Sequence, residues 1–323
     1  MRAPTLERVL GSVATGERGG PLVLVTVGIH GNEPAGLHAM RRVLRRLQAV
    51  RAPLEGRIAA FVGNRAGLER NVRFVDEDLN RLWAPARVED LRRSDPRRDN
   101  VERAEQRELL ELLESELDAA EGHVTHLDLH STSGAGPPFT VAAGPPPSRA
   151  AALRLGVPTI LGLEPLVAGT LIDFVGSLGH AAVVLEGGQN ESALTIDHHE
   201  AAVWVTLVGA GVLRADDVPG GLATHSARLA SAALALPPAI VIEHVHRLQA
   251  GAAFEMLPGF QNFQAVAQGE LLAREGPGLQ REVRAPWAGL LVMPRYQGQG
   301  LDGFFLGRPA GGAPAHATAT VLG

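Results

Sequence analysis

Four side chains that could bind a metal ion or move a proton lie at the ends of apolar runs in this sequence. His30 directly follows the apolar run 21–29, and Glu33 lies in the Gly/Pro-bearing turn after it. His130 ends the alternating stretch "THLDLH", and Glu186 ends the run "AAVVL". Two histidines and one carboxylate are a recurrent ligand set of catalytic zinc, which keeps a fourth position for water. Water bound to the metal becomes a good nucleophile near neutral pH, and the metal polarises a carbonyl under attack.

Each of these residues also has a plain structural interpretation. A histidine at a strand end is more often a hydrogen-bonded part of the fold than a metal ligand. Glu33 precedes Pro34, and proline suits the first position of a helix. The helix dipole favours a carboxylate such as that of Glu33 near this end. Glu186 could simply be solvated. Residue types and spacing alone therefore leave both interpretations open.

The composition removes several other kinds of chemistry. The 323 residues include no cysteine, which excludes thiolate nucleophiles, cysteine-bound zinc and disulfides. All 30 basic residues are arginine, so a Schiff-base lysine and a P-loop lysine are also excluded. A net charge of −5 gives no indication of nucleic acid or an anionic membrane as partner. No apolar run has the length of a signal-peptide core or a membrane span, so we expect a cytoplasmic protein.

Apolar runs alternate with helical patterns through the first two thirds of the chain. The patterns predict strands at 21–29, 57–63, 125–130 and 181–188, and helices at 35–50, 101–120 and 194–213. Such alternation predicts a three-layer α/β fold with a mostly parallel sheet. Ligand sites of open α/β sheets lie beyond the carboxyl ends of the strands, where the four candidate residues fall. Residues 64–100 are Arg-rich and interrupted by proline, and we expect a long loop with little regular structure.

The strand predicted at 125–130 carries a row of polar side chains. Its strict alternation places His126, Asp128 and His130 on one face. Asp128 is a candidate hydrogen-bond partner for a ligand histidine. A plain surface carboxylate is the equally supported alternative.

Two further histidine-containing stretches are interpreted as structural. "DHHE" (197–200) lies in a predicted helix in which His198 and Glu200 do not share a face, so we expect a solvated surface. The stretch "EHVHR" (243–247) places two histidines on one strand face, and we expect a polar strand face rather than a metal site.

The pattern changes near residue 214. Residues 1–213 form the predicted catalytic domain, 214–237 a linker rich in small residues, and 238–323 a small all-β domain. The stretches "AQGELLAREG" and "APWAGLLV" are similar to a biotinyl/lipoyl-type barrel sandwich, but the chain has no lysine to carry the prosthetic group. A structural or lid role is therefore expected for this domain.

Four stretches, in order, resemble the signature of the succinylglutamate desuccinylase/aspartoacylase family, which is related to the zinc carboxypeptidases. They are "GIHGNEPAG", "GNRAGLERNVRFVDEDLNRLW", "HLDLHSTSG" and "VVLEGG". The later stretch "APWAGLLVMPRYQGQGLDGFFLG" resembles the C-terminal domain of the same family, so the resemblance covers most of the chain. It implies a zinc-carboxypeptidase-like fold for the catalytic domain.

The resemblance also implies the catalytic residues. It makes His30, Glu33 and His130 the ligands of one Zn²⁺ per chain. Glu186 matches the general acid/base, which could take a proton from the attacking water and return it to the departing amine. Arg73 matches the arginine that helps to polarise the scissile carbonyl, since an always-protonated guanidinium suits a developing oxyanion.

Substrate contacts are implied for Asn80, Arg81 and Tyr296. The planar fork of Arg81 suits a carboxylate. One departure concerns specificity, because the aspartoacylase branch holds substrate carboxylates with a tyrosine and an arginine where this chain has Ile172 and Gly176. We therefore do not expect N-acetylaspartate as the substrate. The continuation "GGQNES" also departs from that of the succinylglutamate desuccinylases.

These features predict a zinc-dependent amidohydrolase that removes an N-acyl group from an amino acid or a similar small carboxylate. A carboxypeptidase-like peptidase would use the same metal site on a peptide C-terminus. A non-catalytic zinc- or ligand-binding relative is the third alternative, against which Glu186 and Arg73 argue, because metal storage needs neither. The expected partner is a small acylated amino acid, with neither nucleic acid nor membrane involved. The native substrate, a homo-oligomeric state and the metal used in the cell stay open.

Overall fold

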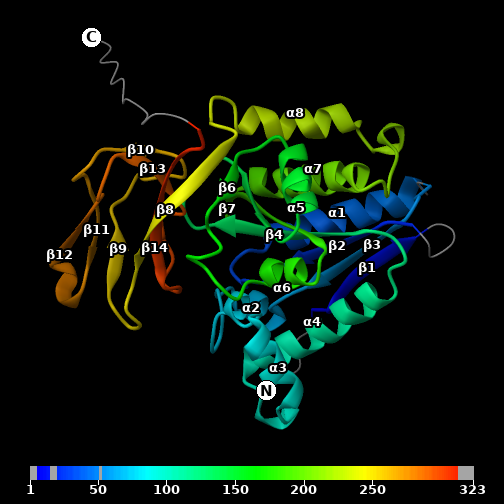
Figure 1. The fold of residues 1–323 in the computed structure, drawn as a ribbon, viewed down its shortest axis with the longest axis horizontal. Helices are drawn as coiled ribbons and strands as arrows, with labels where there is room; N and C mark the ends of the chain where they lie inside the picture. The colour runs from blue at the N-terminus through cyan, green and yellow to red at the C-terminus, as the bar shows by residue number, and fades with distance from the viewer. Residues whose placement is uncertain (1–5, 15–19, 51–52, 312–323) are drawn as a thin grey trace.

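An 11-stranded sheet with helices on both faces organises the part of the chain that the structure describes (Figure 1). The structure is a computed structural model and describes residues 6–14, 20–50 and 53–311. The strands of the large sheet are, in spatial order, β1 (Val9–Ala14), β3 (Arg57–Val62), β2 (Leu22–Val27), β4 (Val124–Thr132), β7 (Ala181–Gln189), β5 (Phe139–Ala143), β6 (Thr159–Leu161), β8 (Ala239–Arg247), β14 (Asp302–Pro309), β13 (Gly289–Val292) and β10 (Ala265–Val266).

The strands that carry the candidate residues run parallel. β2 pairs in parallel with β3 and β4, and β4 pairs in parallel with β7. β2 and β4 are buried along their whole length, as expected for parallel strands covered on both faces. Parallel strands end at a common edge of the sheet, and there His130 lies in register beside Glu186. The predicted sheet therefore brings the candidate residues to one edge.

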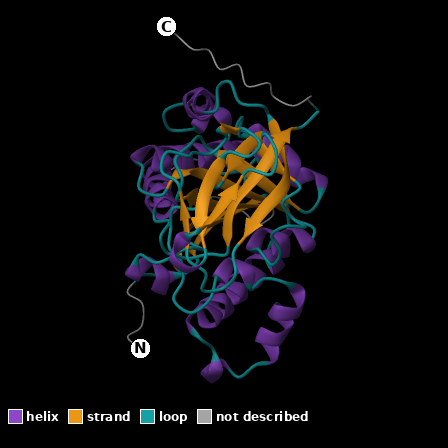
Figure 2. Cartoon of the chain, turned by 90° about the vertical axis from the view of Figure 1, so that its left-hand side faces the viewer, coloured by secondary structure: helices purple, strands orange, loops and turns teal. Residues whose placement is uncertain are grey.

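Helices cover the two faces of this sheet, and the strands lie enclosed between them (Figure 2). The helices are α1 (Ala35–Val50), α2 (Arg65–Arg70), α3 (Pro85–Arg93), α4 (Val101–Asp118), α5 (Pro146–Arg154), α6 (Leu171–Ser177), α7 (Ala193–Gly209) and α8 (Leu222–Ala232). Residues of α1, α5, α7 and α8 share one hydrophobic core cluster with the sheet, and residues of α4 and α6 share another. Short 3₁₀ turns lie at η1 (Leu79–Arg81), η2 (Pro96–Arg98), η3 (Ala215–Asp217) and η4 (Pro277–Leu279).

The C-terminal region extends the large sheet and adds a second one. β8 pairs in parallel with β6 and antiparallel with β14, so the hydrogen bonding of the large sheet continues into this region. The second sheet is antiparallel, in the order β12 (Arg281–Arg284), β11 (Leu271–Glu275) and β9 (Phe254–Met256). A small core that includes Leu272, Leu291 and Phe304 contains residues of both sheets. The predicted fold class, a mostly parallel α/β sheet with a separate antiparallel sheet, is confirmed.

The predicted linker at 214–237 contains η3 and α8, and α8 packs against α7 with Leu229 fully buried. Hydrogen bonds of the large sheet join the two predicted domains. The division into a catalytic domain at 1–213 and a C-terminal domain at 238–323 stays a prediction. Among the described residues, no helix combines the length and apolar character needed to cross a bilayer.

The segment 64–100 is more ordered than its composition predicts, since it contains α2, η1, α3 and η2. The expectation of a long loop with little regular structure is wrong. Leu79, Trp83 and Leu91 anchor the segment, because each is completely buried in the core.

A buried carboxylate organises the loop at 75–77. Glu102, at the start of α4, has no exposed surface. Its Oε1 accepts hydrogen bonds from Asn64 Nδ2 at 2.9 Å and Val75 N at 2.7 Å. Its Oε2 accepts from Asp76 N at 2.9 Å and Glu77 N at 3.2 Å. Glu102 therefore fixes the loop that leads directly into η1.

We expect Glu102→Gln to lower the free energy of unfolding by about 1–3 kcal/mol, since an amide N–H would then face backbone N–H donors in a buried site. Urea denaturation measures this change. The matched control is Glu111→Gln, because Glu111 is exposed on the same helix and should have little effect. Equal unfolding free energies for the two variants would contradict the role of Glu102.

Candidate active site

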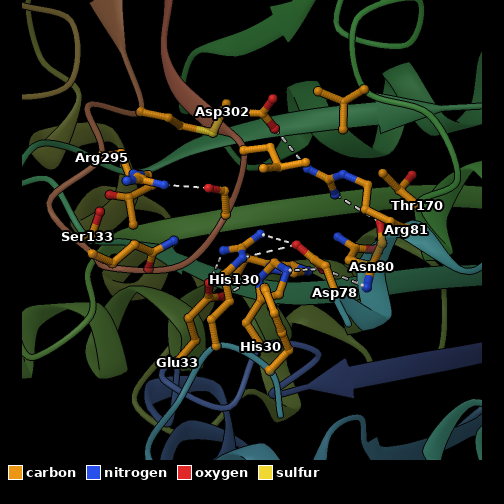
Figure 3. A pocket seen from close by; sticks show the side chains of 18 of the residues that line it. His30, Glu33, Asp78, Asn80, Arg81, His130, Ser133, Thr170, Arg295 and Asp302 are labelled. Atoms are coloured by element: carbon orange, nitrogen blue, oxygen red, sulfur yellow. Dashed lines mark hydrogen bonds and ion pairs between the residues drawn. The ribbon is translucent and has the colours of Figure 1, made fainter. Parts of the chain in front are cut away.

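Three buried side chains converge at the carboxyl edge of the central strands (Figure 3). His30 follows β2, Glu33 lies in the turn before α1, and His130 lies near the end of β4. Glu33 Oε1 is 2.8 Å from His30 Nδ1, and Glu33 Oε2 is 3.0 Å from His130 Nδ1. One ligand atom from each residue lies within 4.8 Å of the others. The structure brings together the three residues to which the resemblance assigns zinc.

The turn between these ligands requires a glycine. A Cβ added to Gly31 would lie 2.0 Å from the backbone carbonyl carbon of Gly67 in α2. The backbone N–H of Gly31 also donates to the carbonyl oxygen of Arg73 at 3.1 Å. The close backbone approach therefore holds the ligand turn against the segment that carries Arg73.

The second ring nitrogen of each ligand histidine faces another carboxylate. His30 Nε2 is 3.2 Å from Asp78 Oδ1, and His130 Nε2 is 3.0 Å from Asp128 Oδ2. The expected contact between Asp128 and His130 is thus confirmed, and Asp128 is buried rather than a surface carboxylate. A neutral imidazole carries one N–H and cannot donate at both nitrogens. A cation bound at the Nδ1 atoms would remove this conflict, so the donor set fits Zn²⁺.

The charges of the cluster shift its pKa values. Burial alone would raise the pKa of Glu33, but the charges of His30 and His130 lower it far below its ordinary value. Burial alone would lower the pKa of His130, but Asp128 and Glu33 raise it well above its ordinary value. The carboxylates around His130 therefore favour positive charge at this position.

Hydrogen bonds extend from His130 into the sheet. Thr26 donates from its hydroxyl to Asp128 Oδ1 at 2.5 Å, and His126 Nε2 is 3.0 Å from Thr26 Oγ1. His126, Asp128 and His130 are all buried on one face of β4, as the alternation predicts. Burial lowers the pKa of His126 to about 4, so this histidine is neutral and can donate to Thr26.

Arg73 lies beside the cluster and is paired with Asp78. Its Nε and one terminal nitrogen are 3.1 and 3.0 Å from Asp78 Oδ2, and its other terminal nitrogen is 3.7 Å from Glu33 Oε1. Burial would raise the pKa of Asp78, but Arg73 and His30 hold it well below its ordinary value. Asp78 also accepts from the backbone N–H of Asn80 at 3.0 Å. Sequence reasoning missed Asp78, although it lies in the stretch "GNRAGLERNVRFVDEDLNRLW" that carries the resemblance.

Glu186 lines the same cavity as the cluster. Its Oε2 atom is buried and has no hydrogen-bond partner among the described residues. Burial is the main cause that raises the pKa of Glu186 to about 7. A carboxyl group with a free oxygen and a pKa near neutrality is suited to accept and return a proton.

Asn80 and Arg81 line this cavity, which has a volume of about 540 Å³. Asn80 Oδ1 accepts a hydrogen bond from Leu171 N at 2.9 Å, so its amide nitrogen is the group left for a ligand. One terminal nitrogen of Arg81 is 3.0 Å from Asp302 Oδ2, and the other donates to the carbonyl oxygen of Asn80 at 2.9 Å. Arg81 is therefore already paired with a carboxylate.

Tyr296 is not among the described residues that line the cavity. Its hydroxyl donates to the carbonyl oxygen of Leu257 at 2.7 Å and accepts from Phe260 N at 3.0 Å. These backbone contacts fix the hydroxyl of Tyr296 outside the cavity lining, and its substrate contact stays a prediction. The neighbouring Arg295 lines the cavity instead. Sequence reasoning missed Arg295, and the only signal was its place in the same "PRYQG" stretch.

Of the two positions at which the chain departs from the aspartoacylase branch, the structure places Ile172 at the cavity and Gly176 away from it. Ile172 of α6 lines the cavity, together with Val141, Val184 and Phe305 of the same hydrophobic core cluster. A Cβ on Gly176 would lie 3.0 Å from the Cα atom of Gly144, so this position faces β5 rather than the cavity. Part of the cavity wall is therefore apolar.

Three of the four residues of the "DHHE" stretch are buried, and the prediction of a solvated surface is wrong for them. Exposure is 8% for His198, 0% for His199 and 2% for Glu200. His199 Nε2 lies 2.8 Å from the carbonyl oxygen of His130. α7 packs against α1, α8 and the sheet, so it has little solvent-facing surface. The apolar run after Glu200 was the sequence feature that indicated this burial.

In the "EHVHR" stretch, His246 Nε2 lies 3.0 Å from Glu275 Oε2, and the ring stacks on Phe304. Among the described residues, the only cluster with metal-ligand geometry is that of His30, Glu33 and His130.

The parallel strands of this α/β fold end at a His–Glu–His cluster, and a glutamate and an arginine lie beside it. This arrangement of side chains is typical of a hydrolase. The family model described as "Succinylglutamate desuccinylase/Aspartoacylase catalytic domain" matches residues 19–206, which is more than half of the 323 residues. The chain belongs to the succinylglutamate desuccinylase/aspartoacylase family, which is named for enzymes that remove acyl groups.

Curated relatives match over shorter stretches. The succinylglutamate desuccinylase of Pseudomonas paraeruginosa is 36% identical over 61 residues, which is 19% of this chain and 18% of the relative. The succinylglutamate desuccinylase of Burkholderia pseudomallei is 30% identical over 110 residues, which is 34% of this chain and 30% of the relative. These matches span less than a third of either relative.

Solved structures match over most of the chain and show the shared fold. The ectoine utilization protein EutE (DoeB) from Ruegeria pomeroyi, in a product-bound structure, has a TM-score of 0.63 at 22% identity, covering 92% of this chain and 87% of that one. The succinylglutamate desuccinylase from Chromobacterium violaceum has a TM-score of 0.61 at 18% identity, covering 91% and 86%. A succinylglutamate desuccinylase/aspartoacylase from Rhodobacter sphaeroides has a TM-score of 0.65 at 17% identity, covering 90% and 86%.

Proposed function

We propose that this protein is a zinc-dependent amidohydrolase that cleaves the amide bond of an N-acyl amino acid or a similar small carboxylate. The observation that carries this proposal is the convergence of His30, Glu33 and His130 in one cavity with Glu186 and Arg73. Membership of a family named for deacylases supports the type of reaction.

His30, Glu33 and His130 would hold the metal, which supplies Lewis-acid chemistry when bound. Asp78 and Asp128 accept hydrogen bonds from the outer ring nitrogens of the two histidines, which orients the rings and leaves their Nδ1 lone pairs for the cation.

Glu186 would carry the proton during the reaction. Its unpartnered oxygen accepts a proton from the attacking water, and the same oxygen then delivers this proton to the nitrogen of the departing amine. The carboxyl group is thereby restored to its starting state at the end of each cycle.

Arg73 would stabilise the negative charge that develops on the carbonyl oxygen. Its guanidinium is permanently charged, and Asp78 holds it in position before the substrate arrives. Asn80 and Arg81 would contact the polar end of the substrate through their N–H groups.

A screen of N-acyl amino acids against short peptides, on zinc-loaded protein, tests this proposal. We expect release of the free amino acid from the N-acyl compounds and no removal of C-terminal residues from the peptides. Cleavage of the peptides alone would favour the carboxypeptidase alternative. If neither class is hydrolysed, the protein is better described as a metal- or ligand-binding member of the family.

A further inference from the structure

One arginine of the cavity has no carboxylate partner. The arginines that line the cavity are Arg73, Arg81, Arg87, Arg247 and Arg295. The first four form ion pairs, Arg73 with Asp78, Arg81 and Arg247 with Asp302, and Arg87 with Glu77. Within the described part of the chain, no carboxylate oxygen lies within 4.0 Å of a side-chain nitrogen of Arg295.

The protein nevertheless holds Arg295 in a defined position (Figure 3). The residue is only 9% exposed, and its guanidinium carbon lies 5.1 Å from the centre of the Phe254 ring. One terminal nitrogen donates to the carbonyl oxygen of Gly300, and the backbone N–H donates to Gly303 O at 2.9 Å. The Nε atom is buried and has no hydrogen-bond partner in the part of the chain that the structure describes. These contacts leave the second terminal nitrogen without a described hydrogen-bond acceptor.

An unpaired guanidinium in such surroundings is costly to the protein. Burial removes water from the charge, and no described carboxylate lies close enough to form an ion pair with it. Burial and the positive charge of Arg73 lower the pKa of Arg295, and the negative charge of Asp302 opposes this shift without cancelling it. An anion that enters the cavity would offset this cost, and a carboxylate matches the planar guanidinium fork.

We propose that Arg295 binds the carboxylate of the substrate. This inference rests on the proposed function and deepens it, because it assigns the charge of the substrate to a residue of the C-terminal region. Arg81 also lines this cavity, but its two terminal nitrogens already contact Asp302, which is shared with Arg247, and the carbonyl oxygen of Asn80. Among the described residues, Arg295 is the arginine of the cavity with no carboxylate at ion-pair distance, so its guanidinium is the one left for the substrate carboxylate.

Calorimetric binding to the wild-type protein gives the first test and needs no variant. The probes are N-acetyl-L-leucine, whose side chain suits the apolar wall around Ile172, and its carboxamide, N-acetyl-L-leucinamide. The carboxylate should bind about 10- to 100-fold more tightly, since hydrogen bonds to a charged group contribute this much. A wild-type protein without preference for the carboxylate would overturn the proposal.

The variant Arg295→Gln should abolish this preference and leave the affinity for the carboxamide within about twofold. Arg87→Gln is the matched control, because Arg87 lines the same cavity, is paired with Glu77 and is half exposed. Arg295→Lys should restore part of the preference for the carboxylate, because lysine restores the positive charge but not the two parallel N–H donors of the guanidinium. In kinetics on a hydrolysed substrate, Arg295→Gln should raise KM and leave kcat nearly unchanged.

Retention of the carboxylate preference in Arg295→Gln would refute the role of Arg295. Failure of the proposed function is a separate result, namely that zinc-loaded protein hydrolyses no N-acyl amino acid. The calorimetric comparison does not depend on turnover, so it tests Arg295 in either case.

Discussion

Glu186→Gln is expected to lower kcat by a factor on the order of 10² to 10⁴, with an unchanged zinc content. Glutamine keeps the size of the side chain but cannot carry the proton between water and amine. The loss should therefore fall on kcat, with a smaller change in KM. Steady-state kinetics on the substrate found by the screen, with metal analysis of the same samples, measures both quantities. Near-normal kcat in Glu186→Gln would show that the mechanism proposed here is wrong.

The pH dependence gives a second measure of the same residue. Glu186 must be deprotonated to accept a proton, and burial raises its pKa to about 7. Activity should therefore fall as the pH drops through the pKa of Glu186, and a bound cation places this fall below pH 7 because it lowers that pKa. Glu186→Gln should lack this acid limb. Glu191→Gln is a suitable control, because Glu191 is exposed just beyond the same strand, and its profile should match the wild type.

Removal of a ligand is expected to abolish both metal binding and activity. The wild-type protein should contain about one zinc per chain, and His130→Ala should lose most of it, because two ligands rarely hold a catalytic zinc. Added zinc should raise the Tm of the metal-free wild-type protein, since a ligand that binds only the folded state stabilises it. The Tm of metal-free His130→Ala should respond much less.

The matched control for this experiment is His38→Ala, because His38 is exposed on α1, outside the cavity. That variant should keep its zinc, its Tm response and its activity. Full metal retention in both His30→Ala and His130→Ala would rule out the assigned ligands.

The central sheet, and the meeting of His30, Glu33 and His130 at its edge, could be predicted from the sequence for a simple physical reason. Parallel strands covered on both faces appear as continuous apolar runs, and their polar end residues meet at one edge of the sheet. The alternation along β4 likewise predicted which side chains share a face with His130. Local periodicity carries the positions of these side chains, whereas their assignment as metal ligands came from the family resemblance.

The remaining features depend on contacts between distant parts of the chain. The loop at 75–77 is ordered by the carboxylate of Glu102, and no hydrophobic pattern reveals that contact. The direction of Tyr296 is set by hydrogen bonds to Leu257 and Phe260, which lie about 40 residues earlier. The choice between Tyr296 and Arg295 as the residue that faces the cavity is therefore a tertiary property.

The two walls of the cavity are built on different parts of the large sheet, and this has a consequence for how such proteins diverge in evolution. The cluster that can bind metal lies at the ends of β2 and β4, whereas Asp302 and Phe305 come from β14, several strands away. Substitutions on β14 and in the segment before it can change what enters the cavity without moving His30 or His130. A lineage can therefore acquire a new substrate while it inherits the same chemistry.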